Sequence, residues 1–182
     1  MIAAARVVSV SRDDHHGFSK PAVPRIRLIE GFGVEGDVHG GATTQHRYLL
    51  AKDPQRRNLT QVHLIASELF PELLDAGFTV GPGDLGENVT TAGVDLIALP
   101  LGTRIHLGDD AIVEVTGIRS PCHLINEFQR GLMKACLSKD ERGHVIRKAG
   151  IMAVVERGGV VEPGSGIRVV LPAGAPVPLP VV

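Results

Sequence analysis

The amino-acid sequence predicts one mainly β domain of the barrel or sandwich type. Its 22 glycines and 12 prolines separate short runs rich in β-branched residues, of which residues 6–10, 103–107 and 111–116 are the clearest. Such runs, bounded by turn residues, are typical of strands in an all-β fold. With 182 residues, 43% of them hydrophobic, the chain is long enough to bury one sizeable core. We expect a single domain over residues 1–182, with a core at about 30–171.

The best-defined predicted element is a β-hairpin at residues 103–117. Gly108-Asp109-Asp110 lies between its two apolar runs and supplies residues that tolerate a positive φ. Two later runs, residues 151–155 and 167–171, are bounded by glycine- and proline-containing turns. We expect these two runs to be the strands that complete a barrel.

A few short helices are expected at the periphery. Residues 67–77 have a helical pattern, in which Ser67 is placed to cap the start and Gly77 to end the helix. A second helix is predicted from about 126 to 139, where apolar residues recur every three to four positions. Both segments are short compared with the strand-forming part of the chain.

The charge balance argues against nucleic-acid and membrane partners. The 19 basic and 20 acidic side chains nearly cancel, so no long-range positive field attracts an anionic polymer or surface. No segment supplies the roughly 20 apolar residues that cross a bilayer, and the N-terminal stretch reaches charge within a few residues. We therefore expect a cytoplasmic protein that meets any anionic ligand locally.

The chain has two cysteines, Cys122 and Cys136, and a domain of this size does not need a disulfide, so both are interpreted as reduced thiols. Cys122 follows the predicted hairpin in the turn Arg119-Ser120-Pro121-Cys122-His123. A neighbouring guanidinium and imidazole favour the thiolate, which is the form that ligates a metal. A small buried hydrophobic side chain is the alternative for Cys122 and the preferred interpretation of Cys136. Zinc is a minority hypothesis, because no CxxC or HExxH motif occurs.

Two glycine-containing loops contain more polar side chains than a plain connection between strands requires. Asp37 and His39 lie together on one loop with flanking glycines. Residues 83–90 place an acid, the amide of Asn88 and the hydroxyl of Thr90 at the entry of a strand, where backbone amides can also meet a ligand. Local turns whose side chains satisfy nearby amides are the alternative for both loops.

Other basic and imidazole side chains are assigned to solvent or to an anion pocket. Those interpreted as solvated are His15, His16 and His144. Arg47, with His46 and the pair at 56–57, could instead line an anion pocket, because guanidinium groups hold phosphate in bidentate fashion. Solvated surface charge is the alternative for these residues too.

Taken together, these segments resemble the MOSC family, the domain named for the C-terminal part of molybdenum cofactor sulfurase. The matching segments, in the family's order, are Gly36-Asp37-Val38-His39, Gln61-Val62-His63-Leu64, Gly83-Asp84-Leu85-Gly86-Glu87-Asn88-Val89-Thr90, Leu99-Pro100-Leu101-Gly102-Thr103 and Pro121-Cys122. They cover about residues 30 to 170. The resemblance is closest to the small stand-alone bacterial MOSC proteins, because neither a cysteine-desulfurase domain nor a companion N-terminal barrel domain is found beside these segments.

The resemblance implies a MOSC-type β-barrel with a few short peripheral helices that binds molybdenum cofactor (molybdopterin); pyridoxal phosphate binding is a further family-level term. It also implies that Cys122 ligates molybdenum or carries transferable sulfur. The other residues implied to surround the pocket are Asp37, His39, Asn88 and Thr90, with Arg119 suited to the pterin phosphate or an anionic substrate. His123 and Leu124 after the cysteine, and the loop 53–57, depart from the motifs and leave the substrate open.

Three functions are carried forward from these residues. The leading hypothesis is a molybdenum enzyme that reduces N-hydroxylated or N-oxide compounds, with Cys122 as metal ligand, His39 or Asp37 passing protons, and a separate reductase supplying electrons. The second is a sulfur carrier or cofactor-handling module with a persulfide on Cys122. The third is a metal-free domain that binds a phosphorylated ligand through Arg47, Arg119 and loop amides.

The Pro-rich C-terminal arm, residues 172–182, is expected to be extended, because its prolines lack the amide donors that a helix or a central strand needs. Packing of this apolar arm on a second copy, together with the short exposed strand edges of a partly open barrel, favours a homodimer as one arrangement.

Overall fold

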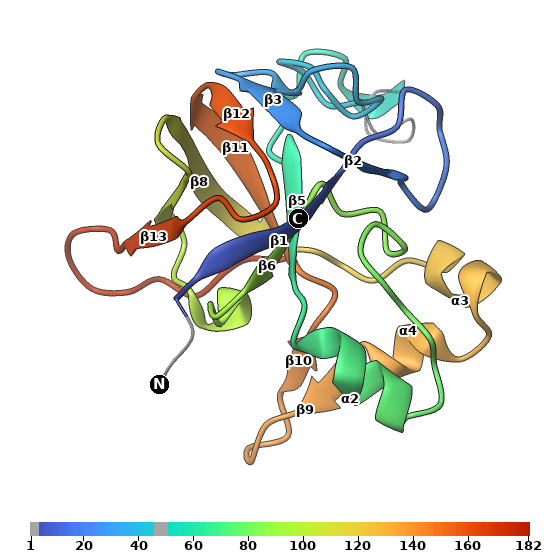
Figure 1. Cartoon of the computed structure of the whole chain (residues 1–182). Helices are drawn as coiled ribbons and strands as arrows, with labels where there is room; N and C mark the ends of the chain where they lie inside the picture. Colours follow the sequence, from blue (N-terminus) through green and yellow to red (C-terminus); the bar gives the residue numbers. More distant parts are fainter. Residues whose placement is uncertain (1–3, 46–50) are drawn as a thin grey trace.

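The computed structural model describes residues 4–45 and 51–182 and is mainly β with a few short helices, as the sequence predicts. The strands are β1 (Arg6–Ser11), β2 (Ala22–Val23), β3 (Ile26–Ile29), β4 (Gly33–Val34), β5 (Val62–Ala66), β6 (Val89–Ala92), β7 (Arg104–Leu107), β8 (Ala111–Ile118), β9 (Leu137–Lys139), β10 (Val145–Arg147), β11 (Ile151–Arg157), β12 (Gly159–Val161) and β13 (Ile167–Val170). The helices are α2 (Leu69–Asp75), η1 (Leu96–Ala98), α3 (Leu124–Phe128) and α4 (Leu132–Ala135). Figure 1 shows α2, α3, α4 and the β9–β10 hairpin gathered at the lower right, away from β8 and β13.

An eight-stranded sheet forms the body of the molecule, in the order β13-β7-β8-β11-β5-β6-β1-β2. Neighbouring strands are antiparallel except β5 and β6, which run parallel. The predicted hairpin is confirmed: β7 and β8 pair around a turn whose first residue, Gly108, has a φ of 68°. The two late runs form β11 and β13, but β11 lies in the middle of the sheet and β13 at its edge.

The expected β-barrel does not close, because within the described chain the sheet remains open. Its two ends approach each other through an isolated bridge between Arg6 and Gly166 and a 2.8 Å hydrogen bond from Val7 N to Ser165 O. The tight turn at Pro163-Gly164 lies opposite β1, so the ladder cannot extend there. β12, in the connection from β11 to β13, pairs with β3 in a separate three-stranded sheet with β4.

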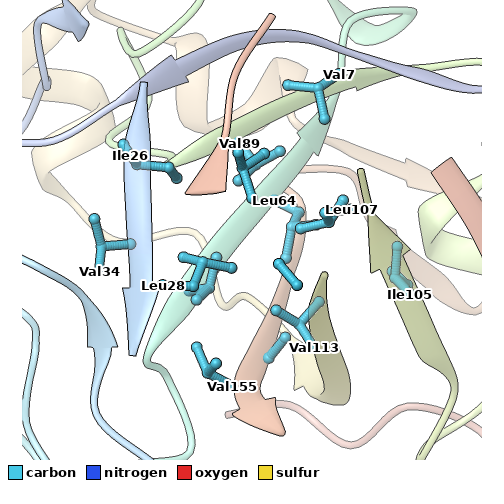
Figure 2. Close-up of a cluster of buried hydrophobic side chains, with 14 of the residues drawn as sticks. Val7, Ile26, Leu28, Val34, Leu64, Val89, Ile105, Leu107, Val113 and Val155 are labelled. Carbon is cyan, nitrogen blue, oxygen red and sulfur yellow. The ribbon is translucent and has the colours of Figure 1, made fainter. Parts of the chain in front are cut away.

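The core lies between these sheets and is built from inward-facing aliphatic side chains (Figure 2). Side chains from β3, β5, β7, β8 and β11 meet there: Leu28, Leu64, Leu107, Val113 and Val155. A second buried cluster lies among the helices and includes Leu73, Ile125 and Cys136. Each buried aliphatic side chain contributes about 1.5–3 kcal/mol relative to exposure.

The first predicted helix is confirmed as α2, with Gly77 at a φ of 90° just past its end. Its N-cap, however, is Glu68, and no side chain caps the start. The second predicted helix is wrong, because residues 126–139 are divided among the end of α3, α4 and β9. Gly131 adopts a φ of 91° between the two helices, and Asn126 Oδ1 accepts hydrogen bonds from the amides of residues 131 and 133 there.

The C-terminal arm, residues 172–182, forms no helix and a single bridge, at Val181, and it packs on its own chain. Leu101 N donates to Val177 O at 2.9 Å, and Val181 forms a parallel bridge with Ile118 at the end of β8. Leu179 packs against the main core. None of the helices in the described ranges has both the length and the apolar character needed to cross a membrane.

Candidate functional site

Asp37, on the loop after β4, is the centre of a buried polar cluster. Both of its carboxylate oxygens accept from Lys20 Nζ, at 2.9 and 2.7 Å, and the two side chains are only 3% and 2% exposed. Asn88 Nδ2 donates to the same carboxylate at 3.0 Å, and the amides of His39 and Asp13 donate at 3.0 and 3.3 Å. Three loops that are distant in sequence are therefore joined at one carboxylate.

The Lys20–Asp37 pair is ionised. Burial by itself raises the pKa of Asp37, but the hydrogen bond from His39 and the charge of Lys20 outweigh burial and hold this pKa well below its usual range. Burial lowers the pKa of Lys20, and the carboxylate of Asp37 opposes that effect. An ionised carboxylate with this many donors holds the three loops together, and it does not take up a proton at neutral pH.

Asn88 extends the cluster to β5. Its Oδ1 accepts from His63 N at 3.2 Å, while its Nδ2 also donates to Ser11 O at 3.2 Å. His63 Nε2 lies 2.8 Å from Ala149 O, and a carbonyl only accepts, so Nε2 carries the proton. Burial lowers the pKa of His63 well below its ordinary value, so the imidazole is neutral.

Glu87 is completely buried beside this cluster. Its Oε1 accepts from Gly83 N at 2.7 Å and from Thr90 Oγ1 at 2.9 Å. Among residues 4–45 and 51–182, Oε2 has no hydrogen-bond partner, and neither does the buried Ser11 Oγ. Burial raises the pKa of Glu87, which favours the neutral acid.

Replacing Glu87 by Gln tests this protonation state. A folded-state pKa above the unfolded value of about 4.3 gives stability that is fully present below that pH and is lost as pH rises through the folded-state pKa. Glutamine imitates the neutral acid at every pH. We therefore expect the unfolding free energy of Glu87→Gln, relative to that of wild type, to increase by about 1–3 kcal/mol from acid to alkaline pH. Urea unfolding followed by circular dichroism measures this difference. Parallel stability curves would show that the folded-state pKa of Glu87 is not raised above its unfolded value, and the exposed Glu141→Gln is the control.

Cys122 lies just after β8, on the turn that leads into α3. Its side chain is half-buried, whereas Cys136 is fully buried, which confirms the interpretation of Cys136 as a small core residue. Arg119 Nη1 donates to Leu85 O at 2.8 Å, and its guanidinium carbon lies 5.9 Å from the centre of the Phe18 ring. Burial lowers the pKa of Arg119, whose side chain is half-buried three positions before Cys122.

The structure therefore brings together most of the predicted site residues. Asp37, His39 and Asn88 are directly bonded, and Thr90 reaches the same cluster through Glu87. Arg119 is connected to the cluster by its hydrogen bond to the carbonyl of Leu85, which lies on the same loop as Asn88. The residues that the sequence analysis missed are Lys20, His63 and Glu87. His63 and Glu87 lie inside segments that match the family, which could have indicated them, whereas Lys20 lies outside every matched segment and nothing in its local pattern indicates burial.

Several other predicted residues lie apart from this cluster. Arg47 and His46 are outside the described residues, and Arg56 and Arg57 are exposed. The residues predicted to be solvated, His15, His16 and His144, are exposed. His15 could share an ion with Asp13 and Asp14, whose ligand atoms lie within 4.8 Å of one another, but such exposed acidic groups are common without one.

An open groove of about 810 Å³ lies between α2, η1 and the β9–β10 hairpin, and none of the predicted site residues lines it. Its wall is mainly apolar and includes the Glu72–Lys148 ion pair, whose charged atoms are 2.6 Å apart. Gly150, at the border of the groove, accepts from Arg119 N through its carbonyl at 3.0 Å. The groove is therefore a neighbour of the strand that leads to Cys122.

This chain belongs to the MOSC domain family, because the family model matches residues 35–168, most of its length. YuaD from Bacillus subtilis superimposes with a TM-score of 0.75 at 24% identity, covering 91% of this chain and 95% of that chain. YiiM from Geobacillus stearothermophilus gives 0.65 at 22%, covering 91% and 75%, and YiiM from Escherichia coli gives 0.62 at 19%, covering 94% and 73%. At these identities the likeness shows the fold alone. Among curated proteins no match was found.

Proposed function

We propose that this protein binds molybdenum cofactor with Cys122 as a metal ligand and reduces N-hydroxylated or N-oxide compounds. The observation that carries the proposal is a half-buried thiol on the turn that follows Arg119, whose half-buried guanidinium donates to Leu85 O at 2.8 Å. A cysteine thiolate is a soft ligand of the kind that suits such a metal. MOSC domains are associated with functions related to this cofactor, which supports the same reading.

The donor set fits the cofactor. Arg119 has five N–H donors, and within the described part of the chain its side chain donates one hydrogen bond, to Leu85 O at 2.8 Å. The remaining donors suit a phosphate or another anionic group, which arginine binds in bidentate fashion. Cys122 would hold the metal and Arg119 the anionic end of the cofactor or substrate.

The reaction requires two electrons and two protons to convert an N-hydroxyl compound into the amine and water. Bound cofactor supplies the metal and dithiolene chemistry for oxygen-atom transfer, and a separate reductase supplies the electrons. His39 suits the proton transfer, because its side chain is 41% exposed and its Nδ1 lies 3.4 Å from Asp37 Oδ1. Asp37 orients and stabilises the imidazolium while remaining ionised, so we assign it a supporting role.

The test is molybdenum and pterin content in wild type and Cys122→Ser, each expressed in a cofactor-competent host. We expect stoichiometric metal in the wild type and a loss of about tenfold or more in the variant. Cys136→Ala removes the other thiol from the helical cluster and should retain the metal. Absence of both metal and pterin from wild-type protein would contradict the proposal.

Sulfur carriage is the second candidate, because the partial exposure of Cys122 and the nearby cation also suit a persulfide. In that case purified wild type carries sulfane sulfur on Cys122 and no stoichiometric molybdenum. Mass spectrometry of the intact protein before and after reduction distinguishes this result from metal binding.

A further inference from the structure

The last residues of the C-terminal arm form a neighbour of β8 immediately before the candidate site. Ile118 N donates to Pro180 O at 2.8 Å, and Val182 N donates to Ile118 O at 3.1 Å. Ile118 and Val181 form the parallel bridge between the two segments. Both backbone groups of Ile118 are therefore satisfied by the arm.

The arm takes the place that β7 leaves beside β8. The antiparallel pairing of these two strands continues as far as Val115, whose amide donates to Thr103 O at 2.9 Å and whose carbonyl accepts from Gly102 N at 3.0 Å. On the opposite edge, Arg119 N donates to Gly150 O at 3.0 Å. The end of β8 is thus held from both sides, by β11 and by the arm.

Gly117 is what permits this close approach. A Cβ at position 117 would lie 2.7 Å from Pro180 O and 2.7 Å from each γ-methyl of Val182, so its three nearest neighbours all belong to the arm. Real Cβ atoms do not approach other atoms this closely. Any side chain at this position must displace the arm or the strand.

We propose that the C-terminal arm is a positioning strap for the Arg119–Cys122 segment. Without it, the amide and carbonyl of Ile118 would form an unpaired edge, and the backbone of the strand end would be hydrogen-bonded only on the side of β11. The arm thereby fixes where the guanidinium and the thiol lie relative to the loop of Leu85. This role goes beyond the proposed function and holds whether or not a cofactor binds.

Deleting residues 180–182 tests the strap and leaves Leu179 in the core. We expect amide exchange at Ile118 and Arg119, measured by NMR, to accelerate by about tenfold, because the strand end loses one of its two neighbours. Alkylation of Cys122 by iodoacetamide should accelerate by roughly threefold or more, since a looser segment exposes the thiol more often. Cys136, which is 0% exposed, is the internal control in the same peptide map.

A pair of glycine variants tests the same contact without shortening the chain. Gly117→Ala should reproduce the faster exchange and alkylation, whereas Gly166→Ala should not, because a Cβ there meets nothing within 4 Å. In the protein lacking residues 180–182, Gly117→Ala should add little, since the atoms it would strike are gone. Wild-type exchange and alkylation in the deletion variant would overturn the proposal, whatever the cofactor content.

Discussion

Lys20→Met is expected to lower the free energy of unfolding by about 3–5 kcal/mol. The change removes the ammonium but leaves the carboxylate of Asp37 buried, with its side chain 2% exposed. The donors that remain, chiefly Asn88 Nδ2 and the amide of His39, do not carry a full positive charge. Urea unfolding followed by circular dichroism is the measurement, because the chain has no Trp.

Lys148→Met is the matched control. Lys148 Nζ lies 2.6 Å from Glu72 Oε2, a distance close to that of the buried pair, but the two side chains are 24% and 57% exposed. An ion pair that is open to water contributes about 0–1 kcal/mol. If both variants lost the same small amount, Asp37 would not be the buried anchor that its hydrogen bonds indicate.

The effect of Lys20→Met should also depend on pH. The pKa of Asp37 is held low in the folded wild type, so its contribution to stability is present above the unfolded value of about 3.9 and is lost as pH falls through the acid range. Without the ammonium this pKa rises, and protonation then relieves the buried charge. The difference in unfolding free energy between wild type and variant should therefore shrink toward acid pH.

The sequence could predict the site residues that lie on recognisable turns better than the charged partners that those residues bind. Asp37, Asn88 and Cys122 were found because turn-forming glycines or a proline mark their loops. Lys20 and Glu87 were not, because a charged side chain beside a turn is normally solvated, and burial depends on partners that arrive from distant loops. The partner of Lys20 is 17 positions away in the sequence, and Asn88 is 51 positions from the same carboxylate.

The fold shows the same division between local and distant determinants. The hairpin of β7 and β8 depends on a local turn and adjacent apolar runs, so the sequence predicts it correctly. Barrel closure depends on whether distant edges meet, and there β1 and the segment around the Pro163-Gly164 turn share only an isolated bridge and a few backbone hydrogen bonds. The predicted helix at 126–139 fails for a local reason: Gly131 takes a left-handed conformation, which helical spacing of apolar residues does not reveal.

Gly83→Ala is expected to lower the unfolding free energy by about 2–5 kcal/mol, the sum of a left-handed backbone and a collision in a packed interior. Gly83 has a φ of 85°, and a Cβ there would strike the carbonyl of Lys20 and lie 2.8 Å from Ser11 Oγ. The same glycine donates its amide to Glu87 Oε1 at 2.7 Å. A shift of this backbone therefore disturbs both the Lys20 segment and the Glu87 carboxyl group.

Gly77→Ala separates the two causes of that loss. Gly77 has a φ of 90°, close to that of Gly83, but a Cβ there meets nothing within 4 Å, so only the backbone cost of about 1–2 kcal/mol applies. If the two variants are equally destabilised, the collision with the Lys20 carbonyl adds nothing to the loss of unfolding free energy. The loop of residues 83–90 would then be free to shift away from Lys20. If Gly83→Ala is clearly worse and also lowers cofactor content while Gly77→Ala does not, the close approach of this loop to Lys20 is required for the site as well as for the fold.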